Sequence, residues 1–425
     1  MKLIINFASK LGVDSISRLI GFVTLPLITR ALGPEGYGQF SYLFVILSYF
    51  GFFIDFGYLS YGTNKLCDNS GNKKVVGNII SLQLLTAFIS FLILCIVAFF
   101  FLETEKYILL IIFSATFISQ IFSIKYYYLA SNKLYYNSVS ELAGQVVYTL
   151  LIFFVFTKYP TVFTLIILTV LQTFITAMFL FIPYLRKNKI EIDLNLKRNL
   201  KTLKDAYKLG IASKAEALTV SFIILCLGFF LNQESVGLYN ASYKIYVVLL
   251  TVVQGLSYTF MPVLLMNIKN NDKIKLNKIS FVFYIYLLTG IVLSTLTYIF
   301  ADKIILILFG ETFFESISIL KSFSVTIFIW PILMFLGLII LAYNKYNYLL
   351  ITSVFSAVFS VLFSLIFIKS FGLTGAGYVL PFVAAGSIII SAYFLKKISG
   401  EKGFRFSELF SLKSALTEFK LLIFK

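Results

Sequence analysis

Histidine is absent from the 425-residue sequence, cysteine occurs three times and tryptophan once. Without imidazole groups the chain cannot build a histidine metal site, a Ser-His-Asp triad or a histidine proton relay. Cys67, Cys95 and Cys226 form no closely spaced pair, so zinc and redox motifs are not expected. Charged residues make up 13% of the chain, whereas a soluble domain carries roughly 25%. These shortages argue against a soluble enzyme.

Long apolar stretches are what the sequence does contain. Hydrophobic residues make up 59% of it, and the stretches 75–102, 159–185 and 370–395 lack Asp, Glu, Lys and Arg. Each exceeds the ~20 residues that span a bilayer. The sequence therefore predicts an all-α polytopic membrane protein with about twelve transmembrane helices. The predicted spans are 7–32, 37–61, 76–102, 107–130, 136–157, 161–185, 208–231, 236–266, 279–301, 316–343, 346–368 and 374–395.

The basic residues between these spans fall mostly on one side. If the N-terminus is cytoplasmic, the outer loops hold Lys106, Lys158, Lys303 and Lys369, and the inner loops and termini hold most of the others. This distribution follows the positive-inside rule, so both termini are expected in the cytoplasm. The net charge of +17 is thereby explained by topology, and no nucleic-acid partner is expected. The first residues lack a small-residue cleavage site, so a retained first helix is expected.

Two short motifs recur about 200 residues apart, which is the mark of an internal repeat in transporters. The matched segments are Glu35 to Phe40 with Glu234 to Tyr239, and Ala130-Ser-Asn-Lys133 with Ala342-Tyr-Asn-Lys345. We predict two six-helix bundles related by a parallel repeat, 1–185 and 208–395, joined by a basic cytoplasmic linker, 186–207. Residues 396–425 combine lysines with leucines at helical spacing, which predicts an amphipathic cytoplasmic tail on the anionic leaflet. A simple anchor without a role in transport is the alternative.

Several ionisable residues lie inside the predicted spans, where charges are costly and usually face a bundle interior or water. Cations scattered over several depths suit a path for an anionic substrate such as a phosphate. We therefore predict a substrate-binding cationic cavity, and we treat the embedded acids as ion-coupling or ion-pair candidates. The cations are Arg18, Arg30, Lys125, Lys214, Lys244 and Lys321, and the acids are Asp14, Asp55, Glu141 and Glu216.

Structural explanations stand beside this functional one. Asp14 and Arg18, four residues apart, could pair on one helix face. Arg30 and Lys321 lie near helix ends and could extend to the interface, and the outer half of the predicted spans offers no embedded acid to them or to Lys244.

Asp55 and Glu141 have no charged neighbour at helical spacing, which favours them as carriers of a coupling proton or sodium ion. No other cofactor, metal or catalytic residue is expected. Prolines also occur inside the predicted spans, and there they permit kinks that can serve as bending points. Pro26 is the predicted hinge.

Four segments together resemble a known family: Leu32-Gly-Pro-Glu-Gly-Tyr-Gly38, Asp55-Phe-Gly-Tyr-Leu59, Val236-Gly-Leu-Tyr-Asn-Ala-Ser-Tyr-Lys-Ile245 and Phe371-Gly-Leu-Thr-Gly-Ala-Gly377. The sequence resembles the polysaccharide transporter family over essentially its whole length. The similarity is to the Wzx-type O-antigen flippases of the multidrug/oligosaccharidyl-lipid/polysaccharide exporter superfamily.

The resemblance implies a flippase of lipopolysaccharide assembly. Such a protein moves undecaprenyl-diphosphate-linked oligosaccharides from the cytoplasmic to the periplasmic leaflet of the bacterial inner membrane. Alternating access between two lobes, a proton or sodium gradient, and membrane lipids and other polysaccharide assembly proteins as partners are further implied. Family members commonly carry an acidic residue in the second half of the seventh span, and residues 219–231 have none.

Three alternatives remain open. A drug/cation antiporter of the same superfamily should favour an acidic cavity, which the outer cations oppose. A lipid II flippase is a second alternative, but resemblance to that family would imply about two further spans. A membrane enzyme of polysaccharide assembly is expected to have a large outer loop with catalytic residues, whereas the longest outer loop, 302–315, is short. We therefore do not expect an enzyme.

Overall fold

The computed structural model describes residues 2–68, 73–188, 202–203, 206, 219–269, 274–402 and 409–423. These residues contain helices and no β-strand. Nine of their helical segments are long and apolar enough to cross a membrane, which confirms the predicted all-α membrane fold. The chain divides into unit 1, Met1–Lys214, and unit 2, Ala215–Lys425. The count of twelve spans, the cytoplasmic termini and the linker at 186–207 stay predictions.

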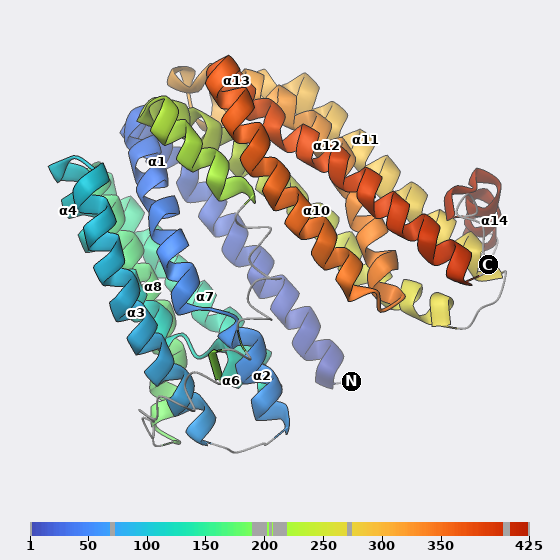
Figure 1. The fold of residues 1–425 in the computed structure, drawn as a ribbon, viewed down its shortest axis with the longest axis horizontal. Helices are drawn as coiled ribbons and strands as arrows, with labels where there is room; N and C mark the ends of the chain where they lie inside the picture. The colour runs from blue at the N-terminus through green and yellow to red at the C-terminus, as the bar shows by residue number, and fades with distance from the viewer. Residues whose placement is uncertain are drawn as a thin grey trace. The chain divides into compact units, whose positions relative to one another are not determined.

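Unit 1 is built around α1 (Figure 1). This long helix contacts α3, α4, α5, α7 and α8, so it forms the centre of the unit's packing. The helices of unit 1 are α1 (Lys2–Ile54), α2 (Tyr58–Asp68), α3 (Lys73–Phe101), α4 (Thr104–Phe113), α5 (Thr116–Phe122), α6 (Lys125–Ala130), α7 (Leu134–Leu151) with a π-helical turn (Ile152–Phe156), and α8 (Val162–Leu185).

Unit 2 is organised around α12, which contacts α10, α11 and α13. In Figure 1, α11, α12 and α13 run alongside one another. A short apolar helix, Thr219–Phe230, precedes α10. The labelled elements are α10 (Gln233–Lys269), α11 (Ile274–Leu308), a 3₁₀ turn (Glu311–Phe313), α12 (Ser316–Ala342), α13 (Tyr346–Lys402) and α14 (Leu412–Ile423).

Two very long helices each contain two predicted spans joined at a glycine. Within α1 the non-helical residue is Gly33, with φ 66° and ψ 180°, and within α13 it is Gly372, with φ 60° and ψ −137°. The torsions of Gly33 are accessible essentially to glycine alone, and the positive φ of Gly372 also favours glycine. The Gly-Pro and Phe-Gly motifs of the sequence therefore mark these two breaks.

The predicted fourth span, 107–130, matches a candidate membrane span at Thr104–Ala130, but it is interrupted within its length. It consists of α4, α5 and α6, with breaks at Ser114–Ala115 and Ser123–Ile124. Hydroxyl groups return to the backbone at the first break, where Ser114 Oγ donates to the Ile111 carbonyl at 2.6 Å and Thr116 Oγ1 donates to the Phe113 carbonyl at 3.0 Å. Such local hydrogen bonds compete with the backbone hydrogen bonds of a helix. Neither break contains a glycine or proline that would have predicted it from the sequence.

The repeated Asn-Lys motif forms the same turn in both units. Asn132 and Asn344 have φ of 53° and 58°. Lys133 N–H donates to the Tyr128 carbonyl at 2.9 Å, and Lys345 N–H donates to the Ile340 carbonyl at 3.2 Å. A left-handed residue followed by this backbone bond is the Schellman helix end. The structure therefore supports the repeat that the sequence motifs indicate.

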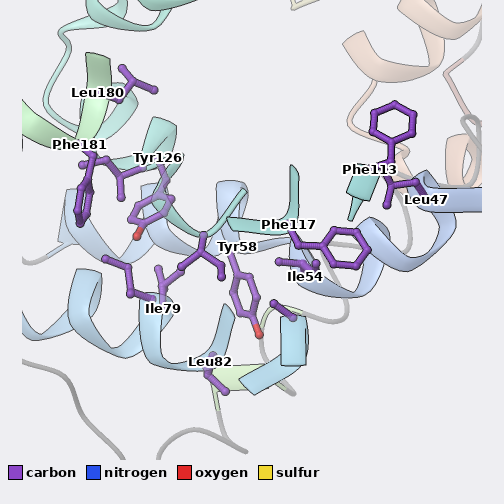
Figure 2. Packing of buried hydrophobic residues seen from close by; sticks show 14 of the residues in the cluster. Leu47, Ile54, Tyr58, Ile79, Leu82, Phe113, Phe117, Tyr126, Leu180 and Phe181 are labelled. Atoms are coloured by element: carbon purple, nitrogen blue, oxygen red, sulfur yellow. The ribbon is translucent and has the colours of Figure 1, made fainter. Parts of the chain in front are cut away.

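The core of unit 1 lies where α2, α5 and α6 meet α1 and α3 (Figure 2). Tyr58, Phe113 and Tyr126 are among its largest fully buried side chains. Lipid is as apolar as these residues, so close packing rather than transfer from water holds such a core together within the bilayer. This packing fixes α6, and with it the start of the candidate site.

The C-terminal tail is partly integrated into unit 2. α13 continues past the predicted boundary at 395 to Lys402, and α14 packs against α11. Leu409 is fully buried in the unit 2 core, and Tyr284 Oη donates to the Phe410 carbonyl at 3.0 Å. Leu412 and Leu416 remain exposed. The anionic leaflet as their partner stays a prediction.

Candidate functional site

Lys125 and Glu141 form an ion pair in unit 1, with Lys125 Nζ 2.7 Å from Glu141 Oε1. Lys125 begins α6 directly after the break at Ile124, and Glu141 lies on α7. Asn137 Nδ2 donates to the Lys125 carbonyl at 3.3 Å and so ties the start of α6 to α7. The side chains of Lys125 and Glu141 are 36% and 42% exposed, so both remain accessible to a ligand. The two residues lie on different helices, so the pair cannot be found by looking for opposite charges three or four residues apart in the sequence.

Uncharged amides extend this pair into the helix bundle. Gln145 follows Glu141 by one turn of α7, and it accepts a hydrogen bond from Gln172 Nε2 of α8 at 2.9 Å. Gly21 of α1 lies against the same amide, because a Cβ there would be 3.3 Å from Gln145 Nε2. A polar layer thus lies between α1, α7 and α8. Our sequence interpretation missed these glutamines because it considered only ionisable side chains.

Asp55 lies in the turn between α1 and α2, where Gly57 has φ 85° and donates its N–H to the Asp55 carbonyl at 2.7 Å. Its carboxylate interacts electrostatically with Tyr58 and Tyr126. These tyrosines come from α2 and α6 (Figure 2). The Oη atoms of both tyrosines are buried without a hydrogen-bond partner among the described residues. Asp55 therefore places a negative charge near the buried hydroxyl groups of Tyr58 and Tyr126, which could each donate a hydrogen bond.

Lys321 corrects one expectation. Its Nζ lies 2.9 Å from Asp302 Oδ1 in the last two turns of α11, so the prediction that no embedded acid is available to it is wrong. Asp302 was assigned to an outer loop, but α11 extends through it to Leu308. The side chains are 36% and 53% exposed, and such exposed pairs contribute only about 0–1 kcal/mol to stability.

Lys244 lies on an exposed face of α10. The helical period places Lys244, Thr251, Gly255 and Tyr258 on one side of the helix, and we call these four residues the α10 face. Lys244, Gly255 and Tyr258 are exposed, and a Cβ at Gly255 would meet nothing within 4 Å. Among the described residues no carboxylate forms an ion pair with Lys244. A membrane-spanning helix thus presents an accessible cation.

Arg30 and Pro26 both belong to α1, ahead of the break at Gly33. Arg30 is exposed. The helix continues through Pro26, and Thr29 Oγ1 donates to the Leu25 carbonyl at 2.9 Å and also approaches the Pro26 carbonyl at 3.3 Å. The non-helical torsions of α1 occur at Gly33 rather than at Pro26. The hinge role of Pro26 stays a prediction.

Four predicted site residues cannot be placed. Asp14 and Arg18 belong to α1, but their side chains lie outside what the structure describes. Lys214 and Glu216 lie outside the described residues altogether. The structure therefore brings Lys125 together with Glu141 in unit 1, and it places Lys244 and Lys321 separately on α10 and α12 of unit 2.

The fold is that of transporters of the MOP superfamily. An inward-facing multidrug resistance MATE family transporter of this superfamily is 16% identical, with a TM-score of 0.72, and the match covers 95% of this chain and 99% of that one. The lipid II flippase MurJ in an inward closed conformation is 14% identical, with a TM-score of 0.71 and coverage of 97% and 92%.

A third similar structure is a MOP superfamily transporter from Pyrococcus furiosus, described by the reverse polarity of its binding pocket. It is 15% identical, with a TM-score of 0.60 and coverage of 95% of both chains. At these identities the likeness concerns the fold alone.

The sequence gives a more specific assignment. The family model for polysaccharide biosynthesis protein matches residues 3–268, which is more than half of the chain. This protein belongs to the polysaccharide biosynthesis protein family, and the resemblance read from its motifs is confirmed at that level. Comparison with curated proteins finds no significant match.

Proposed function

We propose that this multi-pass membrane protein is a flippase for undecaprenyl-diphosphate-linked oligosaccharides. It moves them from the cytoplasmic to the periplasmic leaflet of the bacterial inner membrane by alternating access. The family match and the fold support a membrane flippase or transporter, and the lipid-linked substrate is the specific part of the proposal. The O-antigen of lipopolysaccharide is the glycan that the motif resemblance favours.

The observation that carries this proposal is the accessible Lys244 on the α10 face. A lysine turned toward hydrocarbon is costly, so the face is expected to border water. The anionic oxygens of a diphosphate that enters this water-filled path can accept strong, charge-assisted hydrogen bonds from the Lys244 ammonium group. The polyprenyl chain needs no such path, because it is as apolar as the lipid around it.

The ion pair of unit 1 suits the same substrate. A phosphate that reaches the partly exposed Lys125 competes with Glu141 for one ammonium group. Glu141 and Asp55 are the described candidates for carrying a coupling proton or sodium ion. Replacing Asp55 with Asn should abolish the dependence of transport on an imposed ion gradient, and unchanged gradient dependence would remove Asp55 from this role.

Complementation of a flippase-deficient strain that makes the matching glycan tests the function directly. Wild type should restore surface polymer on a gel, Lys244→Ala should not, and Lys244→Arg should retain activity because it keeps the charge. Lys303→Ala is the control, since Lys303 is exposed at the far end of α11 and its Nζ lies 5.8 Å from the Phe300 ring. All variants are checked for membrane expression. Wild type that restores no polymer would defeat the flippase proposal.

The drug/cation antiporter is the second candidate because MATE transporters share the fold. An accessible lysine on α10 repels a cationic drug, so this candidate predicts that Lys244→Ala maintains or improves drug export. Measuring export of a cationic dye from cells that carry wild type or Lys244→Ala separates the two. Energy-dependent dye export by wild type, together with failed complementation, would favour the antiporter.

A further inference from the structure

Two lysines converge on one aromatic ring where the two ends of α13 meet. Lys345 Nζ and Lys397 Nζ each lie 5.9 Å from the centroid of the Tyr348 ring, so the two ammonium groups are within twice that distance of each other. Tyr348 also stacks on Phe394, with ring centroids 4.3 Å apart and planes at 1°. We call Lys345, Tyr348 and Lys397 the lysine–tyrosine cluster.

The fold explains why residues so far apart in the sequence meet here. α13 contains two predicted spans joined at Gly372, and the stack of Tyr348 on Phe394 shows that its two ends lie side by side. Both rings pack against the hydrophobic core of unit 2. Lys345 N–H donates to the Ile340 carbonyl at 3.2 Å, which fixes the turn that precedes α13. The cluster is therefore held by the packing of unit 2.

Exposed tyrosines place this cluster at the level of lipid headgroups. Tyr346 and Tyr393 lie on the same two ends of α13 and are 59% and 65% exposed. Tyrosine is enriched at the membrane–water interface, where its ring lies among the headgroups. Leu350 and Ile351, about one turn further into the predicted span, are also exposed. A lipid beside α13 can therefore place its headgroup at the lysines and its chains on this apolar surface.

The chain supplies little negative charge near the cluster. No acidic residue occurs between 316 and 400 in the sequence, so neither α12 nor α13 up to Gly400 supplies a carboxylate. Among the described residues no ion pair involves Lys397, and the side chain of Glu401, one turn later, is not among them. Lys396 adds a further exposed cation. Neighbouring ammonium groups repel each other, and a bound anion offsets that repulsion.

The corresponding end of unit 1 is built differently. Lys133 and Tyr136 are the repeat counterparts of Lys345 and Tyr348. Tyr136 stacks on Tyr128 of α6 at 4.7 Å, and no cation of the described residues lies over its ring. The positive-inside rule accounts for lysines at both of these helix ends. It does not account for two lysines over one ring, which is the distinctive feature of unit 2.

We propose that the lysine–tyrosine cluster binds the headgroup phosphate of an anionic lipid in the leaflet predicted to be cytoplasmic. Basic sites between membrane helices on that side bind such headgroups, and phosphate oxygens accept charge-assisted hydrogen bonds from lysine. The Tyr348 ring attracts both ammonium groups and so holds them ready for one headgroup. A phospholipid and a polyprenyl diphosphate offer the same chemistry. The inference goes beyond the proposed flippase function and does not depend on it, because a phospholipid satisfies it equally.

Native mass spectrometry of the purified full-length protein measures the binding of one lipid at a time. The probes are cardiolipin, phosphatidylglycerol, undecaprenyl diphosphate and, as the zwitterionic reference, phosphatidylethanolamine. The double variant Lys345→Gln/Lys397→Gln should weaken binding of at least one anionic lipid by about tenfold or more, the effect of losing charge-assisted hydrogen bonds. Binding of phosphatidylethanolamine should stay unchanged.

Lys133→Gln/Lys187→Gln is the matched control, because it removes two exposed lysines from the corresponding end of unit 1. It should leave the binding of all four lipids unchanged. Tyr348→Leu keeps both charges but removes the ring, and it should weaken binding of the same anionic lipid by roughly two- to fivefold. Thermal unfolding of each variant shows that it is folded.

The outcomes identify the lipid or overturn the site. Tighter binding of undecaprenyl diphosphate than of either phospholipid assigns the cluster to the carrier, and the reverse order assigns it to a phospholipid of the membrane. Equal losses in the two double variants would show that the lysines act only through net charge and would overturn the site, as would unchanged binding in Lys345→Gln/Lys397→Gln. Failed complementation by wild type would defeat the flippase proposal and leave phospholipid binding at the cluster intact.

Discussion

Exchanging the charges of Lys125 and Glu141 tests whether their ion pair serves transport or only the fold. The variants are Lys125→Glu, Glu141→Lys and the double variant that carries both. Lys133→Gln is the control, because Lys133 is an exposed lysine at the turn between α6 and α7. The double variant keeps an ion pair between the same two helices but moves the cation from α6 to α7.

Exposure sets the expected magnitude. Both side chains are more than a third exposed, so solvent screens their attraction and the pair contributes about 0.2–1 kcal/mol to the free energy of unfolding. Each single reversal brings like charges together and costs a similar amount. A hydrogen bond from Lys125 to a substrate phosphate is stronger, about 1.5–3 kcal/mol, which corresponds to roughly 10- to 100-fold in transport. Transport should therefore fall far more than stability.

Flipping of a fluorescent lipid-linked oligosaccharide in proteoliposomes measures transport, and thermal unfolding of the same preparations measures stability. The double variant should regain wild-type stability, so the coupling energy from the double-mutant cycle equals the sum of the two single losses, about 0.4–2 kcal/mol. Its transport should stay about tenfold or more below wild type. A double variant that transports at the wild-type rate would refute a substrate role for Lys125 and leave the pair as a structural contact.

Three further predictions concern stability and are measured by thermal unfolding. Gly33→Ala should lower the free energy of unfolding by about 1–3 kcal/mol, because the torsions of Gly33 are accessible essentially to glycine. The control is Gly400→Ala, which should not destabilise the protein because Gly400 lies in a helix with open space at Cβ. Equal effects of the two substitutions would contradict the argument from backbone torsions. Leu409→Ala should cost about 2–5 kcal/mol because it empties a fully buried site, and a change below about 0.5 kcal/mol would show that the tail is not part of the core. Lys321→Ala should cost at most about 1 kcal/mol because its pair with Asp302 is exposed; a larger loss would mean that the pair is screened from water.

The fold class could be predicted from the sequence because apolar runs and loop lysines report directly on the bilayer. The predicted spans also end close to Gly33, Asn132 and Asn344, which adopt positive φ in the structure, a conformation that glycine and asparagine tolerate better than other residues. The breaks inside the fourth span escaped prediction. At the first break the hydroxyl groups of Ser114 and Thr116 bond to backbone carbonyls, and serine and threonine make the same bonds in unbroken membrane helices.

The candidate site was only partly predictable. Embedded charge identified Lys125, Glu141 and Lys244 as candidates, because charge is costly in a span wherever the chain places it. The pairing of Lys125 with Glu141 and of Lys321 with Asp302 depends on which helices become neighbours.

The matched turns at Asn132 and Asn344 indicate that an ancestral half-length gene was duplicated and fused. Two identical halves would have presented every side chain twice. A fused chain is free of that symmetry, and it carries Lys244 in one unit where Val45 is buried in the other. The fusion thus permits one unit to carry a cation at a position where the other buries an apolar side chain, a difference that a homodimer of the ancestral half could not encode.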